Sequence, residues 1–174
     1  MINIEILEAT INDIEVLQKS GRQTFSETFA ASNSSENMTQ YLETGFSTEK
    51  LLTELANTNA VFYIVKSENE VVGYLKLNFG DAQTELKDSK ALEIERIYIA
   101  KAFQGKNIGQ LLYEKAMQVA TQKNVEYVWL GVWEENQKAI NFYKKNGFEA
   151  FEKHLFKLGD DEQTDIMMKL KIKQ

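Results

Sequence analysis

Apolar and polar residues alternate along several stretches of the chain in the pattern of half-buried β-strands. Ile2, Ile4 and Ile6 alternate with polar neighbours at the start, and residues 92–99 do so near the middle. Continuous apolar runs elsewhere indicate more deeply buried strands. Together these patterns predict strands over residues 1–7, 61–65, 71–79, 92–99, 126–133, 148–157 and 165–172.

Between these strands, apolar residues recur at helical spacing. A first helix follows a cap at Asn12 or Asp13, and Gly147 is expected to end the last one. The spacing predicts the others over residues 33–46, 48–56, 108–123 and 136–146. Because strands and helices mix in this order, we expect an α/β fold, a mixed sheet with helices on both faces.

Two polar segments interrupt this pattern. Residues 80–90 contain acidic side chains without periodicity and are expected to form a mobile loop. Residues 159–162 form an acidic turn between the last two predicted strands. We find no internal repeat, low-complexity tract or linker, so a single domain over residues 1–174 is expected.

Composition narrows the classes of function. The chain has no cysteine, which excludes disulfides, thiolate metal sites and cysteine nucleophiles. Its one histidine, His154, offers no triad and no His-rich metal site, and is expected to be a packing or surface residue. The start of the chain lacks the features of a signal peptide, and no apolar run reaches a membrane span. We therefore expect a cytoplasmic protein without a metal.

The net charge of −6 argues against nucleic-acid binding and fits a cationic substrate better. Glu27, Glu36 and Glu43 lie on predicted helices. Each is interpreted either as a solvated helix charge or as an attraction for a polyammonium substrate. The sequence does not decide between a monomer and a homodimer.

A short run after the central predicted strand, QGKNIG at residues 104–109, is suited to bind an anion. Its glycine and asparagine residues let consecutive backbone amides point toward one place at the start of a helix. A phosphate there would meet unpaired N–H groups and the positive end of the helix dipole. The run is neither GxGxxG nor GxxxxGK[ST], so neither a Rossmann site nor a P-loop is indicated.

The same run resembles the acetyl-CoA signature of the GNAT family of N-acetyltransferases. Gln104 and Gly109 match the outer positions of that signature, and Asn107 replaces its middle glycine. Asparagine is the residue besides glycine that most readily adopts positive φ. The stretches ENMTQYLETGF, LEIERIYI, YVWLGVWEENQKAINFYKKNGF and GDDEQTDIMMK resemble PaiA-type diamine or polyamine N-acetyltransferases of that family. The resemblance covers essentially the whole chain.

The resemblance implies the GNAT fold, a mostly antiparallel sheet with a bulged and splayed central strand, and acetyl-CoA as acetyl donor. It puts the Ile97 and Ile99 amides against the pantetheine arm, with the Ile97 N–H nearest the thioester oxygen. It makes Tyr143 the acid that protonates the thiolate, where periodicity alone indicates a core aromatic. Asn136 would contact pantetheine besides capping its helix. The implied coenzyme-binding residues are Ile97, Tyr98, Ile99, Gln104, Gly105, Lys106, Asn107, Ile108, Gly109, Gln110, Asn136, Tyr143 and Lys145.

Glu93 and Glu95 are the candidate bases. Because alternate residues of a strand share a side, both are expected on the side of Ile97. The carboxylate is expected to act through ordered water, and partial burial would raise its pKa toward a useful range. Glu95 is favoured because it is nearer to the splayed amides, but the sequence leaves open whether Glu93, Glu95 or water is the base. The other interpretation is that both carboxylates pair with Arg96 or with nearby lysines.

Three functions stay open at this point. The first is an acetyltransferase that acts on a small polyamine or diamine by direct transfer. The second is a domain of the same fold that binds acetyl-CoA and regulates another process, which the departure at Asn107 favours. The third keeps the chemistry but uses a protein or peptide amine as acceptor. Tyr143 and the two strand carboxylates favour an enzyme.

Overall fold

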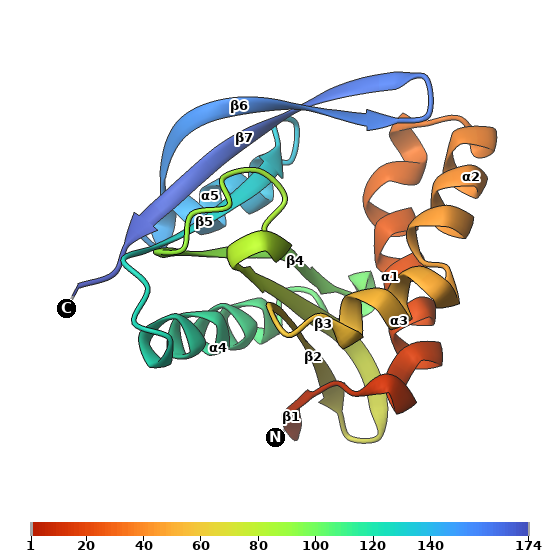
Figure 1. The fold of residues 1–174 in the computed structure, drawn as a ribbon. Coiled ribbons are helices and arrows are strands. Elements are labelled where there is room, and N and C mark those ends of the chain that lie inside the picture. The colour runs from red at the N-terminus through yellow and green to blue at the C-terminus, as the bar shows by residue number, and fades with distance from the viewer. Residues whose placement is uncertain (1, 174) are drawn as a thin grey trace.

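The computed structural model describes residues 2–173, which form one seven-stranded sheet with helices on both faces (Figure 1). The strand order is β1-β2-β3-β4-β5-β7-β6. The strands are β1 (Ile4–Glu8), β2 (Ala60–Ser67), β3 (Glu70–Phe79), β4 (Ala91–Ile99), β5 (Tyr127–Trp133), β6 (Glu149–Leu158) and β7 (Asp161–Lys171). The predicted mixed sheet is confirmed, although Met1 lies outside the described residues.

Strands β4 and β5 form the parallel pair of the described sheet, and they soon separate. They pair only over residues 91–93 and 127–129. Beyond this point β4 continues along β3 as far as Ile99, while β5 continues along β7 as far as Trp133. The other neighbouring strands run antiparallel. The predicted mostly antiparallel sheet with a splayed central strand is therefore confirmed.

A β-bulge interrupts β4 just beyond the residues that pair with β5. Lys76 of β3 lies opposite Arg96 and Leu77 lies opposite Ile94, which leaves Glu95 as the extra residue. The bulge shifts the alternation of side chains, so Ile94 and Ile97 both join the larger core.

The bulge also separates the two candidate bases from Ile97. On β3, Leu77 joins the larger core and Tyr74 joins the smaller one on the other face. Asn78 shares the face of Tyr74 by alternation, and its side chain bonds both Glu93 and Glu95. The prediction that the two carboxylates share the side of Ile97 is wrong, because strict alternation ends at the bulge.

Helices cover the sheet on both faces, as predicted. The helices are α1 (Ile14–Phe29), α2 (Ser35–Gly45), α3 (Thr48–Ala56), α4 (Ile108–Gln122) and α5 (Gln137–Lys145). Leu17 of α1 and Leu51 of α3 are buried in the smaller core. Leu112 of α4 and Ile140 of α5 are buried in the larger core. Figure 1 shows α1, α2 and α3 on one side of the molecule and α4 below β5.

The two polar segments differ from expectation. Asp161 pairs with Leu158, so β7 begins inside the predicted acidic turn and the connection is only Gly159-Asp160. Gly159 has φ 61°, which permits this tight turn. Residues 80–90 are irregular, as predicted, but Gln83 within them is buried. The loop is therefore anchored to the body of the protein.

Candidate active site

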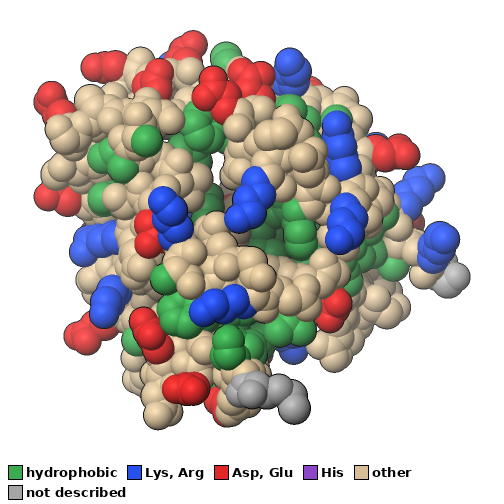
Figure 2. All heavy atoms as spheres, turned by 180° about the vertical axis from the view of Figure 1, so that it is seen from behind, with side chains coloured by type: hydrophobic (Ala, Val, Ile, Leu, Met, Phe, Trp, Pro, Cys, Tyr) green, Lys and Arg blue, Asp and Glu red, His purple; other side chains and the backbone are tan. Residues whose placement is uncertain are grey.

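A cleft of about 670 Å³ lies beside the start of α4, between the diverging strands. We refer to it as the helix cleft. It is lined by the end of β4, the turn that follows, the first turn of α4 and one side of α5. Figure 2 shows a hollow with hydrophobic side chains at its floor and Lys or Arg side chains around it. All the residues predicted to bind the coenzyme line the helix cleft, except Lys106.

The turn before α4 has the geometry expected of an anion site. Gly105 and Asn107 have φ values of 78° and 64°. The predicted positive φ of Asn107 is thus confirmed. A Cβ built on Gly105 or Gly109 would meet no atom within 4 Å, so this part of the cleft is open. The first amides of α4 point into this space without intrahelical partners. The turn can therefore receive a phosphate on backbone N–H groups.

Three lysines line the helix cleft: Lys101, Lys138 and Lys145. Of these, only Lys145 was predicted. Lys138 Nζ donates to Gln104 Oε1 at 3.1 Å, which holds it near the turn. Lys106 instead lies over the Phe103 ring, with Nζ 4.8 Å from the ring centre. Lys106 is therefore not among the residues that line the cleft, although Phe103 beneath it is.

Backbone amides at the end of β4 face the gap between β4 and β5. Ala100 N–H donates to Val72 O on β3 at 2.8 Å. Because successive amides of a strand point to alternate sides, those of Ile97 and Ile99 point away from β3. Gln104 enters the same gap, and its Nε2 donates to Ile99 O at 3.1 Å. The gap thus presents donors from β4 in the way that the sequence predicts.

Glu27 of α1 also belongs to the helix cleft. Its Oε2 accepts a hydrogen bond from Lys101 N–H at 2.8 Å, and its Oε1 accepts one from Gln23 Nε2 at 3.1 Å. Glu27 therefore ties α1 to the turn after β4. Glu27 is exposed, as expected of a solvated helix charge, and it makes this link in addition.

A second hollow of about 270 Å³ lies beside the bulge of β4, and we refer to it as the bulge cavity. Its walls come from α1, α2, α5, β4, β5, β6, β7 and the loop before β4. Many of these side chains are aromatic: Phe25, Phe29, Tyr41, Phe46, Trp129, Trp133 and Phe156. Ile97, Asn136 and Tyr143 line both hollows, so the two meet there.

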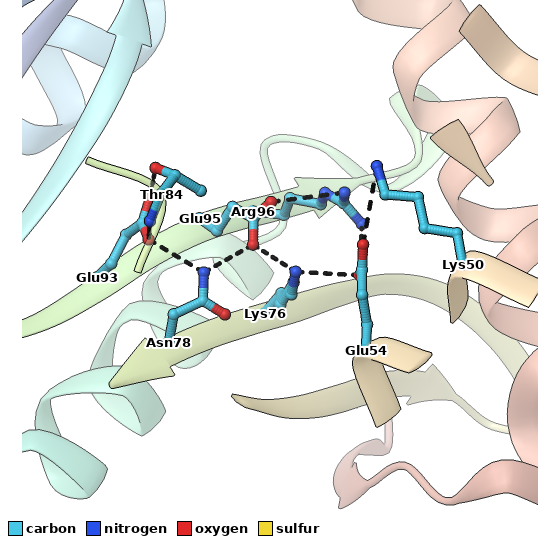
Figure 3. Close-up of polar contacts among 8 residues, drawn as sticks. All are labelled: Lys50, Glu54, Lys76, Asn78, Thr84, Glu93, Glu95 and Arg96. Atoms are coloured by element: carbon cyan, nitrogen blue, oxygen red, sulfur yellow. Dashed lines mark hydrogen bonds and ion pairs between the residues drawn. The ribbon is translucent and has the colours of Figure 1, made fainter. Parts of the chain in front are cut away.

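Glu93 is a buried carboxylate on the wall of the bulge cavity, with 3% of its surface exposed. It accepts hydrogen bonds from Asn78 Nδ2 at 3.0 Å and from Thr84 N–H at 2.8 Å (Figure 3). Burial raises the pKa of Glu93, although these hydrogen bonds oppose the shift. A carboxylate with a raised pKa is better suited to take a proton near neutral pH.

Glu95 lies in a different electrostatic setting. Its carboxylate forms ion pairs with Lys76 and Arg96, which also pair with Glu54 of α3 (Figure 3). Burial would raise the pKa of Glu95, but Arg96 and Lys76 outweigh it and hold the pKa below its ordinary value. These contacts disfavour Glu95 as a base. The predicted pairing with Arg96 and a lysine is found for Glu95, whereas Glu93 has no ion pair within residues 2–173.

Tyr143 and Asn136 occupy the junction of the two hollows. Tyr143 is 6% exposed, and burial raises its pKa, so the phenol stays protonated at neutral pH and can donate a proton. The side chain of Asn136 accepts a hydrogen bond from Ala139 N–H at 3.2 Å. Its predicted role as the cap of α5 is confirmed, and it faces both hollows at the same time.

The bulge cavity is also lined by residues that sequence reasoning missed. His154 of β6 lies opposite Asp165 of β7, and His154 Nε2 is 2.9 Å from Glu85 Oε1. Burial raises the pKa of Asp165, and His154 partly opposes that shift. His154 was expected to be a packing or surface residue, but it also lines the bulge cavity. The β6–β7 pairing brings His154 and Asp165 together, and the loop before β4 brings Glu85 to them.

Across residues 2–173, no group of three or more His, Cys, Asp or Glu side chains is arranged to hold a metal ion. In the same part of the chain, no helix combines the length and apolar character needed to cross a bilayer.

Comparison with known proteins agrees with this geometry. The sequence pattern that defines the acetyltransferase (GNAT) family matches residues 22–148. An uncharacterized N-acetyltransferase of Lactobacillus delbrueckii subsp. lactis is 41% identical over 169 residues, which cover 97% of this chain and 98% of the relative. The spermidine N(1)-acetyltransferase of Thermoplasma acidophilum is 27% identical over 174 residues, with 98% of each chain covered.

Solved structures share the fold over nearly the whole chain. The PaiA N-acetyltransferase of Thermoplasma acidophilum, in complex with coenzyme A, aligns with a TM-score of 0.80 and 25% identity. That alignment covers 98% of this chain and 99% of the other. The chain belongs to the GNAT family of N-acetyltransferases, acyltransferases that take the acetyl group from acetyl-CoA.

Proposed function

We propose that this enzyme transfers the acetyl group of acetyl-CoA directly to a primary amine of a small diamine or polyamine. The observation that carries the proposal is the Glu93 carboxylate. It is buried on the wall of the bulge cavity, its pKa is raised, and it has no cationic partner among residues 2–173. A base of this kind can take a proton from an ammonium group bound in the cavity.

The residues of the helix cleft fit acetyl-CoA. The open turn at Gly105 and Gly109 and the start of α4 can receive the pyrophosphate on backbone amides, with Lys138 and Lys145 adding positive charge. The amides of Ile97 and Ile99 can bond the pantetheine arm in the gap between β4 and β5. This arrangement would direct the thioester toward the junction with the bulge cavity.

Each chemical task then has a residue. Glu93 removes a proton from the substrate ammonium, and the free amine attacks the thioester carbonyl carbon. The Ile97 N–H stabilises the negative charge that develops on the carbonyl oxygen. Tyr143 donates its phenolic proton to the departing thiolate, and the proton that the attacking nitrogen loses as the amide forms returns to the Tyr143 oxygen. The products are the N-acetylated amine and coenzyme A.

The charge of the bulge cavity supports a cationic acceptor. Glu85 and Asp165 also line it, and its aromatic residues can pack against a methylene chain. A molecule whose ammonium groups are joined by methylenes suits walls that carry both carboxylates and aromatic rings. The name of the Thermoplasma acidophilum relative, a spermidine N(1)-acetyltransferase, supports the same class of acceptor.

A thiol-release assay with acetyl-CoA tests the proposal. Spermidine, spermine, a short diamine, a peptide with a free N-terminus and an aminoglycoside are offered as acceptors. We expect the highest kcat/KM with a polyamine or the diamine. Preference for the peptide would contradict the proposed acceptor class. Binding of acetyl-CoA without acetylation of any amine would favour a regulatory domain instead.

A further inference from the structure

The loop before β4 reaches Glu93 at the wall of the bulge cavity. Gln83, which is 1% exposed, holds this loop in place. Its Nε2 donates to Asp88 O at 2.8 Å, and its Oε1 accepts a hydrogen bond from Trp129 Nε1 at 2.7 Å. The next residue, Thr84, is thereby fixed beside the Glu93 carboxylate (Figure 3).

Thr84 bonds both oxygens of that carboxylate. Its N–H donates to Glu93 Oε2 at 2.8 Å, and its hydroxyl donates to Glu93 Oε1 at 2.5 Å. The hydroxyl distance is typical of a charge-assisted hydrogen bond. Thr84 lines the bulge cavity and is itself exposed, whereas Glu93 is buried. The hydroxyl therefore joins a buried carboxylate to the surface of the protein.

Other groups around Glu93 cannot carry a proton away from it. Asn78 on β3 presents an amide N–H to Glu93 and to Glu95, and an amide does not release protons at neutral pH. Beyond Asn78, Lys76 and Arg96 form ion pairs with Glu95 and do not contact Glu93. The bulge cavity itself would be filled by the acceptor. Of the groups that bond Glu93 within residues 2–173, only the Thr84 hydroxyl can both accept and donate a proton.

We propose that the Thr84 hydroxyl relays the proton from Glu93 to bulk water after each transfer. This inference rests on the proposed function, in which Glu93 takes the proton of the substrate ammonium. In the relay, the O–H bond of protonated Glu93 breaks as a new O–H bond forms at Thr84 Oγ1. The original Thr84 hydroxyl proton passes to a surface water. Glu93 returns to the carboxylate form and Thr84 to the neutral alcohol.

Three variants test the relay. Thr84→Val keeps the branched shape and the backbone N–H but removes the hydroxyl, while Thr84→Ser keeps the hydroxyl. Thr53→Val is the control, because it removes an exposed hydroxyl of α3 that donates to Glu49 O and lines neither hollow. We expect Thr84→Val to lower kcat roughly tenfold, a part of the effect of a direct proton-transfer group. Thr84→Ser and Thr53→Val should keep kcat within about twofold of the wild type.

The comparison is made on the plateau of the pH profile. Loss of the Thr84 hydroxyl removes a hydrogen bond that lowers the pKa of Glu93, so this pKa should rise in Thr84→Val. The donors that remain are Asn78 and the Thr84 N–H, and the neighbouring anion is Glu95. At a pH well above the pKa of Glu93, the carboxylate is ionised in every variant. A lower kcat measured there reports slow proton release and not incomplete ionisation of Glu93. Thermal unfolding of each variant confirms that it is folded, and Thr84→Ala replaces Thr84→Val if the latter does not fold.

Two readouts separate a relay from a structural role. A small buffer base such as imidazole should restore kcat in Thr84→Val, and the solvent deuterium isotope effect on kcat should exceed that of the wild type. Wild-type kcat in Thr84→Val, a loss in Thr84→Ser as large as in Thr84→Val, or failure of imidazole to restore activity would overturn the relay. Full activity of Glu93→Gln would instead overturn the role of Glu93 in the proposed function.

Discussion

The helix cleft and the bulge cavity are built in different ways. Two continuous stretches, residues 97–110 and residues 133–145, supply nearly all of the helix cleft, with Glu27 and Thr28 from α1 completing it. The bulge cavity draws on three helices, four strands and the loop before β4, which are dispersed from Phe25 to Met167. The two meet only at a few residues, including Tyr143.

This difference follows from what each hollow recognises. A pyrophosphate is bound by backbone amides and a helix end, which depend on local conformation more than on side-chain identity. An amine acceptor is recognised by the charge and shape of side chains, which must be brought together from several elements. We therefore expect changes in one hollow to leave binding in the other nearly unchanged.

The largest effect is expected from Glu93→Gln. Loss of the base should lower kcat roughly 10²–10³-fold with a polyamine, while the Kd of acetyl-CoA stays the same. The wild-type rate should fall as the pH falls through the raised pKa of Glu93, because the protonated carboxyl cannot take a proton. That limb should be absent in the variant. Stopped-flow or thiol-release rates over pH check this, with the exposed Glu43→Gln as control.

A somewhat smaller effect is expected from Tyr143→Phe at the junction. Removing the phenolic proton should lower kcat roughly 10²-fold, because the thiolate would leave without an acid. The ring still fills its place, so acetyl-CoA affinity by calorimetry should stay within about twofold. Tyr113→Phe is the matched control, since Tyr113 packs in the same core but lines neither hollow. Equal rates for Tyr143→Phe and Tyr113→Phe would remove Tyr143 from the mechanism.

Gly109→Val should act on the helix cleft alone. Its side chain would enter space that is empty of protein atoms within 4 Å, so it should obstruct the phosphates without unfolding α4. We expect acetyl-CoA to bind about tenfold more weakly, or about 1.4 kcal/mol. Gly109→Ala should give an intermediate Kd in the same calorimetric titration. Unchanged affinity in both variants would mean that the pyrophosphate binds elsewhere.

Asp165→Asn should have the smallest effect and should concern the bulge cavity alone. Removing this charge should raise the KM of a diamine about threefold to tenfold, a range typical of one partly exposed ion pair. The KM of a monoamine should change less. Steady-state kinetics with both acceptors measure the difference, and Asp160→Asn in the β6–β7 turn is the control. An equal change for both acceptors would argue against a second ammonium at Asp165.

Sequence reasoning worked best where neighbouring residues decide the structure. The turn at residues 104–109 could be predicted because positive φ at Asn107 and the start of α4 are local properties. The cap at Asn136 and the strands and helices followed from residue spacing for the same reason. The coenzyme roles of single residues came from the family resemblance, and the cleft holds all of those residues except Lys106.

The acceptor side could not be predicted in the same way. The bulge at Glu95 depends on pairing with β3, and it ended the alternation on which the placement of both carboxylates relied. Glu95 was preferred as base because the sequence does not show that Lys76, from that neighbouring strand, pairs with it. Gln83 and Trp129 are far apart in sequence, and so are Glu85 and His154.

By itself, the sequence determined the order of helices and strands, the anion-binding turn and the membership of a family, because these depend on short-range backbone preferences and residue patterns. The tertiary structure decided which carboxylate is free to act, which is paired, and which loop residue reaches it. The reason is physical. The pKa and the access of a buried group depend on neighbours that only the folded chain brings within a few ångströms.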